Sequence, residues 1–538
     1  MKSLMKKVFA AAAAIATVFG LAATTVATAN AADGATLTVS TADAKFVGKT
    51  VNAYKMFSAT VGGEGANKAV SYTLTDTWKP FFMDSTASGL NGATDANVND
   101  KANEYVSELA GDNLVAFATK ASNWAQTQAK NITADKTATV SAGATNGNYT
   151  ATFTGLDYGY YVVAVPGATL ANTSGQYATL VSVDSTNVNA NIKGSLPTVD
   201  KKVQVNGNGA DTADAKIGDT LTFTLTSTIP DMSAYDTYTF NFKDTLSQGL
   251  TFGQVTSVTV EGVTNPLTVN TDYTVTTPTV SDNTLTVAMK DFKAKQQANA
   301  GKKITVTYTA TLNENAVVGG AGNTNSAKIQ YSNNPSTNET GESEPSKVRV
   351  FTYGFTVDKY TGDEYTDKAR RLAGAEFTLA PKNDTDSTAI SFVQVSAGDG
   401  TTNAVYRVAK TGEEGATTTI ITPASGKVVF QGLKNGEYTL TETKAPAGYN
   451  KLASAIGVKV NGSNDGTDTT NATVNITYNN DNNDTTYDQT ASNGVIPVQN
   501  KSGAILPGTG GMGTIAFTVI GVLVIALGVA WTLKRKNA

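Results

Sequence analysis

The chain contains no cysteine and no histidine among its 538 residues. It can therefore form no disulfide, and it lacks the usual side-chain ligands of zinc, haem and iron–sulfur sites. Cysteine nucleophiles and Ser-His-Asp triads are excluded for the same reason. Charged residues make up only 16% of the chain, the net charge is −4, and no basic stripe of the kind that binds nucleic acid is present. We therefore expect no metal, no cofactor and no nucleic-acid partner.

Both ends of the chain carry segments typical of an exported surface protein. Residues 1–31 begin with lysines, continue with an alanine-rich apolar run and end in the small-residue sequence Ala-Asn-Ala, which predicts a cleaved secretory signal peptide. Residues 515–533 are almost wholly apolar, which is enough for one membrane span. The basic sequence at 534–536 is typical of a tail that stays in the cytoplasm. We expect everything between these segments to lie outside the cell.

The region between the ends is dominated by short strands and turns. Alternating runs such as DTLTFTLTST, KKITVTYTATL and ATVNITY recur between Gly, Asn and Pro turn signals. This spacing predicts a mainly β protein of tandem immunoglobulin-like sandwiches. Residues 97–127 differ, because their apolar residues recur at helical intervals, so we expect helices in the first domain.

Composition breaks divide this region into domains. About 470 residues are too many for a single core, and they suffice for about three domains. The sequence changes character around Pro197 and again in the polar stretch 333–346. The expected organisation is a signal peptide at 1–31, domains at 32–195, 196–345 and 346–503, and a C-terminal segment with the membrane span at 504–538.

Three polar residues fall on apolar strand faces of the expected third domain. Alternation places Glu442 on one face with apolar neighbours in YTLTE, and it does the same for Lys359 in GFTVDKY and Asn500 in GVIPVQN. An unpaired buried charge is very costly, so each of these groups needs a partner or must lose its charge. Burial lowers the pKa of a lysine and raises that of a glutamate.

A neutral lysine amine is a nucleophile, and a protonated glutamic acid can polarise an amide carbonyl. Held against such a pair, the carboxamide of Asn500 can be attacked by Lys359 with release of ammonia. In well-oriented cases, proximity of the reacting groups lowers the activation barrier by about 7–11 kcal/mol. We therefore predict a Lys359–Asn500 isopeptide bond between the first and last strands of the domain, with Glu442 as general acid and base. Because each molecule reacts once, this is self-processing and not enzymatic turnover.

The second domain repeats the pattern. Lys201, Asp244 and Asn333 each share a strand face with apolar residues, in TVDKKVQV, FNFKDTL and AKIQYSN. We predict a second isopeptide bond between Lys201 and Asn333, with Asp244 as the promoting acid. Asn325 has the same strand parity and competes with Asn333. An ordinary buried ion pair is the alternative for either set.

Several motifs resemble those of one protein family. The sequence LPGTG at 506–510, followed by the apolar span and KRK, resembles the cell-wall sorting signal of Gram-positive bacteria. YTLTETKAPAGY resembles the E-box of sortase-assembled pilins, and DTLSQGLTF and YSNNP resemble their middle, isopeptide-forming domain. The chain is thus similar to the major, or backbone, subunits of such pili, which implies tandem CnaA/CnaB-type sandwiches.

The resemblance implies a route of assembly. A sortase would recognise the motif through Leu506, Pro507, Thr509 and Gly510. It would cleave the bond between Thr509 and Gly510 and join the Thr509 carbonyl to a lysine of the next subunit. In the family the lysine lies near the end of the first domain in a YPK-like motif. Here the sequence is VNANIKGSLP, so Lys193 takes that place without the Tyr-Pro. The implied partners are identical subunits, a pilus sortase, a housekeeping sortase with peptidoglycan, a tip or minor pilin, and a host receptor that the sequence does not identify.

Other functions fit the sequence less well. A monomeric wall-anchored adhesin would share the sorting signal and the internal bonds but would need no acceptor lysine. A glycosidase would need paired carboxylates in one cleft, whereas Glu442 and Asp244 fall in different domains, each with its own lysine and asparagine. The acidic loop KNDTDSTA could hold calcium, although a solvated turn is the simpler expectation.

Overall fold

The structure is a computed structural model. It describes residues 34–63, 68–127, 132–142, 149–170, 176–192, 194–333, 335, 338–363, 367–382, 388–463, 472–481, 484, 486–503 and 512–536. The predicted signal peptide, Lys193, the sorting motif at 506–510 and most of the KNDTDSTA loop lie outside the described residues.

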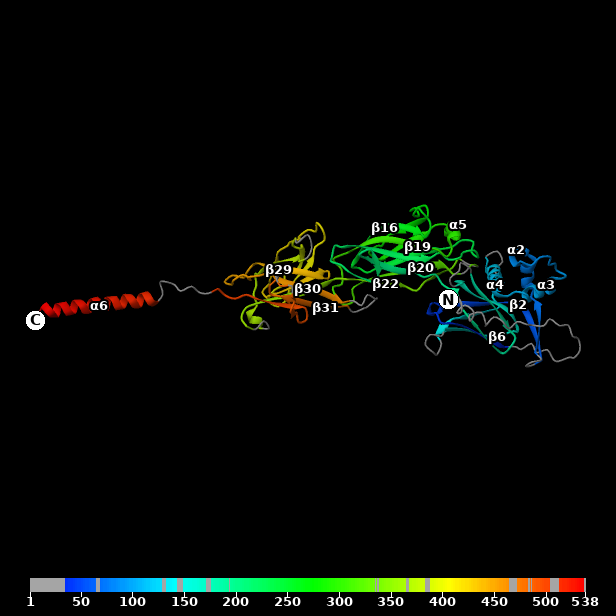
Figure 1. The fold of residues 1–538 in the computed structure, drawn as a ribbon, viewed down its shortest axis with the longest axis horizontal. Coiled ribbons are helices and arrows are strands. Elements are labelled where there is room, and N and C mark those ends of the chain that lie inside the picture. The colour runs from blue at the N-terminus through cyan, green and yellow to red at the C-terminus, as the bar shows by residue number, and fades with distance from the viewer. Residues whose placement is uncertain are drawn as a thin grey trace. The chain divides into compact units, whose positions relative to one another are not determined.

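The first domain, blue to cyan in Figure 1, is a two-sheet sandwich. One sheet has the strand order β5-β6-β1-β9, and the other has the order β10-β7-β2-β3 with β4 added to β2 and β8 to β7. Alternate apolar residues of both sheets, among them Val39, Phe153 and Val163, are buried in one core. The strands are β1 (Ala35–Thr41), β2 (Thr50–Gly62), β3 (Ala69–Leu74), β4 (Lys136–Thr139), β5 (Ser141–Ala142), β6 (Tyr149–Leu156), β7 (Gly159–Leu170), β8 (Gln176–Val183), β9 (Asn187–Asn191) and β10 (Gly194–Ser195).

Helices cover the outer face of the larger sheet in this domain. Val162, the neighbour of the inward-facing Val163, packs with Phe81 and Phe117 of the helical segment in a second core. The predicted helices at 97–127 are confirmed by α3 (Val98–Ser107) and α4 (Gly111–Gln126). Between β3 and α3 lie η3 (Asp76–Trp78), α1 (Lys79–Met83) and α2 (Ser85–Ser88), and η1 (Ala44–Phe46) lies between β1 and β2.

The middle domain, green in Figure 1, is a second sandwich. Its sheets have the orders β12-β11-β14-β19-β16 and β13-β22-β20-β15-β18-β17, with β21 added to β20. The elements are β11 (Asp200–Val205), β12 (Asn208–Ala210), β13 (Thr212–Asp214), β14 (Thr220–Thr228), β15 (Phe240–Leu246), β16 (Leu250–Val260), β17 (Tyr273–Thr276), β18 (Thr284–Met289), α5 (Phe292–Gln296), η4 (Gln297–Asn299), β19 (Lys303–Leu312), β20 (Asn323–Ser332), β21 (Thr340–Glu342) and β22 (Ser346–Phe351). Strand β22 pairs with β20, so this sandwich extends past the expected boundary at 345.

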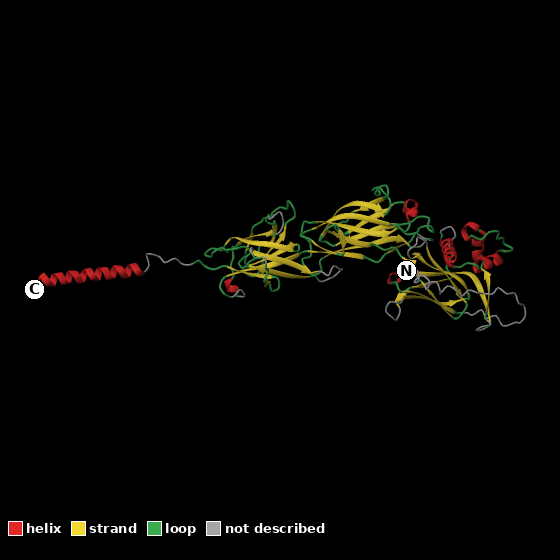
Figure 2. Ribbon diagram, viewed as in Figure 1, coloured by secondary structure: helices red, strands yellow, loops and turns green. Residues whose placement is uncertain are grey.

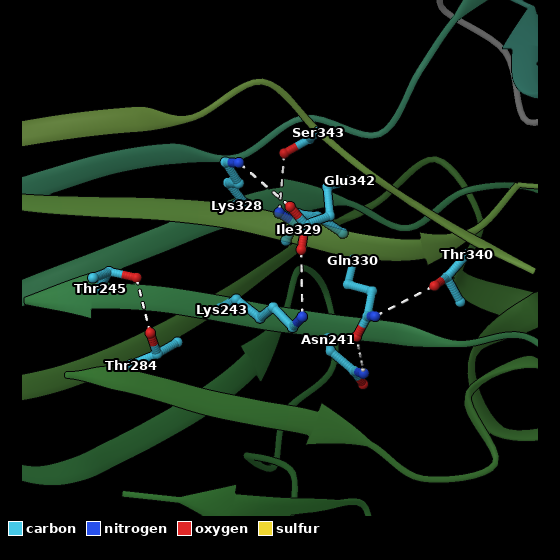
Figure 3. Close-up of polar contacts among 10 residues, drawn as sticks. All are labelled: Asn241, Lys243, Thr245, Thr284, Lys328, Ile329, Gln330, Thr340, Glu342 and Ser343. Atoms are coloured by element: carbon cyan, nitrogen blue, oxygen red, sulfur yellow. Dashed lines mark hydrogen bonds and ion pairs between the residues drawn. The ribbon is translucent and has the colours of Figure 1, made fainter. Parts of the chain in front are cut away.

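Figure 3 shows the solvent-facing side of β15 and β20. Lys243 and Lys328 lie opposite each other on these strands, and the carboxylate of Glu342 is 3.3 Å from each amine, which offsets their repulsion. Lys243 is half-buried on this outer face. Because side chains alternate along a strand, its neighbours Phe242 and Asp244 point into the core.

The third domain is a sandwich with sheet orders β25-β26-β28-β23-β33 and β27-β24-β29-β30-β31-β32. Figure 2 shows that strands dominate here as in the other domains. The elements are β23 (Tyr353–Tyr360), η5 (Lys368–Arg370), β24 (Glu376–Pro381), β25 (Phe392–Ser396), β26 (Ala404–Val408), β27 (Ile420–Ile421), β28 (Lys427–Leu433), β29 (Gly436–Lys444), β30 (Ile456–Ser463), β31 (Thr473–Asn479), β32 (Gln489–Thr490) and β33 (Val495–Gln499). The first strand, β23, pairs in parallel with the last, β33.

The predicted fold class, mainly β with tandem sandwiches and helix in the first domain, is confirmed. The chain divides into two compact units, one of residues 1–352 with 463–473 and one of residues 353–462 with 474–538. The C-terminal helix α6 (Met512–Lys536) belongs to the second unit. Within the part of the chain that the structure describes, no helix meets the length and apolarity of a membrane span, so the predicted span at 515–533 is not confirmed.

Candidate cross-linking sites

The third domain brings Lys359, Glu442 and Asn500 together in its core. Parallel pairing sets Lys359 of β23 opposite Val498 of β33, and the backbone N–H of Asn500 donates to the carbonyl of Tyr360 at 2.9 Å. Lys359 and Asn500 therefore lie on neighbouring strands of one sheet, and Glu442 of β29 reaches them from the opposite sheet. All three residues are at most 2% exposed.

One carboxylate contacts both of the groups that would react. Glu442 Oε1 lies 3.2 Å from Lys359 Nζ, and Glu442 Oε2 accepts a hydrogen bond of 3.0 Å from Asn500 Nδ2. The loop after β29 completes the site, because Leu452 N donates to Glu442 Oε2 at 2.8 Å and the carbonyl of Asn450 accepts from Asn500 Nδ2 at 2.8 Å. These two backbone contacts were not predicted from the sequence, which carries no signal for them.

Burial changes the chemistry of Lys359. Desolvation lowers the pKa of its amine from 10.5 to about 8, and the attraction of Glu442 only partly offsets that effect. A far larger fraction of this amine is therefore neutral, and nucleophilic, near pH 8 than for an ordinary lysine. Asn500 Oδ1 accepts no hydrogen bond from the described residues. The site thus holds a nucleophile, an electrophilic amide and a carboxylate between them.

The middle domain brings Lys201 and Asp244 together in the same way. Lys201 of β11 and Asp244 of β15 come from opposite sheets, both are fully buried, and the lysine amine donates to Asp244 Oδ2. The amine also lies 5.1 Å from the ring centres of Phe223 and Tyr308. Desolvation lowers the pKa of Lys201 to about 8 despite the attraction of Asp244.

The asparagine that lies in this second cluster is Asn325, the competitor, and not the favoured Asn333. Asn325 of β20 is fully buried, and its Nδ2 donates to the hydroxyl of Tyr308 at 2.6 Å, which in turn bonds Asp244. The strand register sets Asp244 opposite Ala327, two residues from Asn325 on the same face. Asn333 lies six residues beyond Ala327, about 20 Å along the strand at the usual rise, so Lys201 cannot reach it.

Tyr308 is the functional residue that sequence reasoning missed. Its hydroxyl accepts from Lys201 Nζ at 2.9 Å and from Asn325 Nδ2 at 2.6 Å, and it donates to Asp244 Oδ2 at 2.6 Å. A signal existed, because alternation in KKITVTYTATL turns this tyrosine inward and a buried hydroxyl needs a partner. Among the described residues, no group of three carboxylates could hold a metal ion.

Comparisons with known proteins match two segments of the chain to domain models. Residues 217–335 match the model of the Gram-positive pilin backbone subunit 2, Cna-B-like domain, and residues 361–476 match a prealbumin-like fold domain. The chain is 26% identical over 274 residues to the trypsin-resistant surface T6 protein of Streptococcus pyogenes serotype M6, covering 48% of this chain and 44% of that protein. It is 29% identical over 252 residues to the fimbrial subunit type 2 of Actinomyces naeslundii, covering 43% of this chain and 45% of that protein.

Each match thus spans less than half the length of these relatives. Among solved structures, the T6 backbone pilin of S. pyogenes superposes on 87% of this chain and 99% of its own, with 17% identity and a TM-score of 0.45. The chain is thus similar to Gram-positive backbone pilins, since residues 217–335 match the pilin backbone model and one of its relatives is a fimbrial subunit.

Proposed function

We propose that the protein is the structural backbone subunit of a covalently polymerised surface pilus, stabilised inside by two isopeptide bonds. One observation carries the proposal: two successive sandwiches of a chain without cysteine each bury a lysine against an acid, and each acid is linked to a buried asparagine, directly in the third domain and through the hydroxyl of Tyr308 in the middle domain. A buried charge pair is weak evidence for stability by itself. Two such pairs, each linked to an asparagine amide directly or through one hydroxyl, fit a reaction better than they fit packing.

The reaction in each domain joins the lysine Nζ to the asparagine Cγ. The neutral amine attacks Cγ, the Cγ–Nδ2 bond breaks, and the proton lost by the amine leaves with Nδ2 as ammonia. The acid holds that proton between the two steps and is unchanged at the end. The resulting bonds are Lys359–Asn500, promoted by Glu442, and Lys201–Asn325, promoted by Asp244.

Subunits would be joined by a second, external chemistry. A pilus sortase cleaves between Thr509 and Gly510 and transfers the Thr509 carbonyl to Lys193 of the next subunit. A housekeeping sortase attaches the finished fibre to peptidoglycan, and the apolar segment at 515–533 retains the precursor in the membrane until then. The resulting fimbria supports adhesion at the cell surface.

An immunoblot of boiled, SDS-treated cell-wall digests from the producing bacterium tests this function. We expect a high-mass ladder that collapses to monomer in a Lys193→Ala strain and persists in a matched Lys45→Ala strain, since Lys45 is an exposed lysine of the same domain. A ladder that survives Lys193→Ala would move the acceptor to another lysine. A single monomer-sized band in the wild type, with sortase expressed, would instead indicate a wall-anchored adhesin.

A further inference from the structure

We propose that Tyr308 is a catalytic residue of the middle domain, which passes a proton from Asp244 to the departing nitrogen of Asn325. This inference rests on the proposed cross-linking function and adds to it. It concerns a residue that contacts both reacting groups, and no tyrosine among the described residues makes such contacts in the third domain's site.

The geometry places the Tyr308 hydroxyl at the centre of the cluster. Its oxygen is 2.9 Å from Lys201 Nζ, the atom that forms the new bond, and 2.6 Å from Asn325 Nδ2, the atom that leaves. It is also 2.6 Å from Asp244 Oδ2, to which it donates. The ring is held in place by stacking on Phe223, at 5.3 Å between ring centres and 17° between planes.

The two sites differ in how the acid reaches the amide. In the third domain, Glu442 Oε2 bonds Asn500 Nδ2 directly at 3.0 Å. In the middle domain, Asp244 is one methylene shorter, and its only link to Asn325 among the described hydrogen bonds runs through the hydroxyl of Tyr308. The tyrosine therefore spans the distance that the shorter acid leaves.

Each proton has a defined path. When Lys201 Nζ attacks Asn325 Cγ, the amine gives one proton to Asp244 Oδ2. The Asp244–Tyr308 hydrogen bond then reverses, so that Asp244 returns a proton to the phenol oxygen as the phenol gives its own to Nδ2. The Cγ–Nδ2 bond breaks, ammonia leaves, and both Asp244 and Tyr308 end in their starting states.

The phenol is suited to relay a proton and not to lose one. Burial and the neighbouring Asp244 carboxylate raise the pKa of Tyr308 well above its usual value, so the phenol stays protonated. A phenylalanine would keep the ring packing on Phe223 but would leave no hydrogen-bonded route between Asp244 and Asn325. The expected loss is therefore in the rate of bond formation.

The test follows bond formation in the full chain during cell-free synthesis, with samples quenched over time and digested for mass spectrometry. Peptides containing the Lys201–Asn325 and Lys359–Asn500 bonds are quantified separately in the same molecules. We expect Tyr308→Phe to slow the first bond about a hundredfold, the lower range for a general acid or base. The second bond should form at the wild-type rate, and Tyr331→Phe, which changes another buried tyrosine of this domain, should leave both rates unchanged.

A further variant separates chemistry from folding. Replacing Tyr308 by 3,5-difluorotyrosine keeps the ring and the hydroxyl but makes the phenol more acidic, so we expect the first bond to form faster. Wild-type rates in both Tyr308 variants would overturn the role of Tyr308 and leave the cross-linking function intact. The absence of both bonded peptides from the wild-type chain would instead overturn the cross-linking function itself.

Discussion

Replacing Glu442 by glutamine tests the proposed chemistry of the third domain most directly. Glutamine has nearly the shape of glutamate and can still bond Asn500 Nδ2 through its carbonyl, but it cannot take the proton that Lys359 must lose. Glu442 is buried between both reacting side chains, and no other carboxylate contacts Lys359 Nζ in the described structure. We therefore expect Glu442→Gln to fold without its isopeptide bond.

The loss of stability follows from the size of the loop that the bond closes. Lys359 and Asn500 enclose about 140 residues, and the loop-entropy relation used for disulfides gives about 5 kcal/mol for a cross-link of that span. For a domain of this size such a change lowers the melting temperature by about 10–20 °C. In the variant Lys359 also remains a free amine buried without a carboxylate, which adds to this cost, although the lysine can limit it by giving up its proton.

Intact-mass measurement and calorimetry of the full chain provide the assay. The variant should be heavier than the wild type by one ammonia, after allowance for the substitution, and its third-domain transition should shift downward. Glu437→Gln is the matched control, because Glu437 lies on the same strand but is partly exposed and pairs with Lys459. A bond that forms fully in Glu442→Gln would refute the acid–base role, and a lost bond with an unchanged melting temperature would refute the loop-entropy argument.

Two further predictions concern the same bonds. Asn325→Ala should abolish the cross-linked peptide of the middle domain, and Asn333→Ala should leave it intact. Peptide mapping of both variants checks this. The opposite result would make Asn333 the bonded asparagine. The second prediction uses Asn500→Ala, in which Lys359 keeps a free amine with a folded pKa of about 8 against 10.5 for an ordinary lysine. Between these two pH values the unfolded state of the variant binds more protons than the folded state, so its unfolding free energy should rise from pH 8 to 10.5. The cross-linked wild type should lack this rise, because its Lys359 nitrogen is an amide that does not titrate. Urea unfolding at several pH values measures the difference, and parallel pH profiles would contradict it.

Much of the third-domain site could be predicted from strand periodicity alone. Lys359, Glu442 and Asn500 each lie near the end of a clearly alternating run, so their inward direction follows from parity. Their meeting in space follows once the first and last strands pair, as β23 and β33 do. The helices at 97–127 were equally accessible, because their apolar spacing has a different period from that of the strands.

The middle-domain site shows where periodicity stops being sufficient. Asn325 and Asn333 have the same parity, so only the register between β15 and β20 separates them, and register depends on tertiary pairing. Tyr308 was not singled out in the sequence, because a tyrosine in a strand usually packs by its ring. The role of its hydroxyl can be inferred only from the structure, which shows that the side chains of Asp244 and Asn325 both hydrogen-bond to it.

The proposed bonds would leave part of the middle domain outside both cross-linked loops. A Lys201–Asn325 bond would close a loop that ends inside β20, so β21 and β22 would lie between the two cross-linked loops and outside both. Strand β22 is held by backbone pairing with β20 and β13 and by its buried residues Val348 and Val350. Force that passes from Asn325 to Lys359 would therefore run through the segment that contains β21 and β22. Only hydrogen bonds and packing would hold this segment in place. The two bonded loops would resist extension covalently, and the chain between them would be the first to yield.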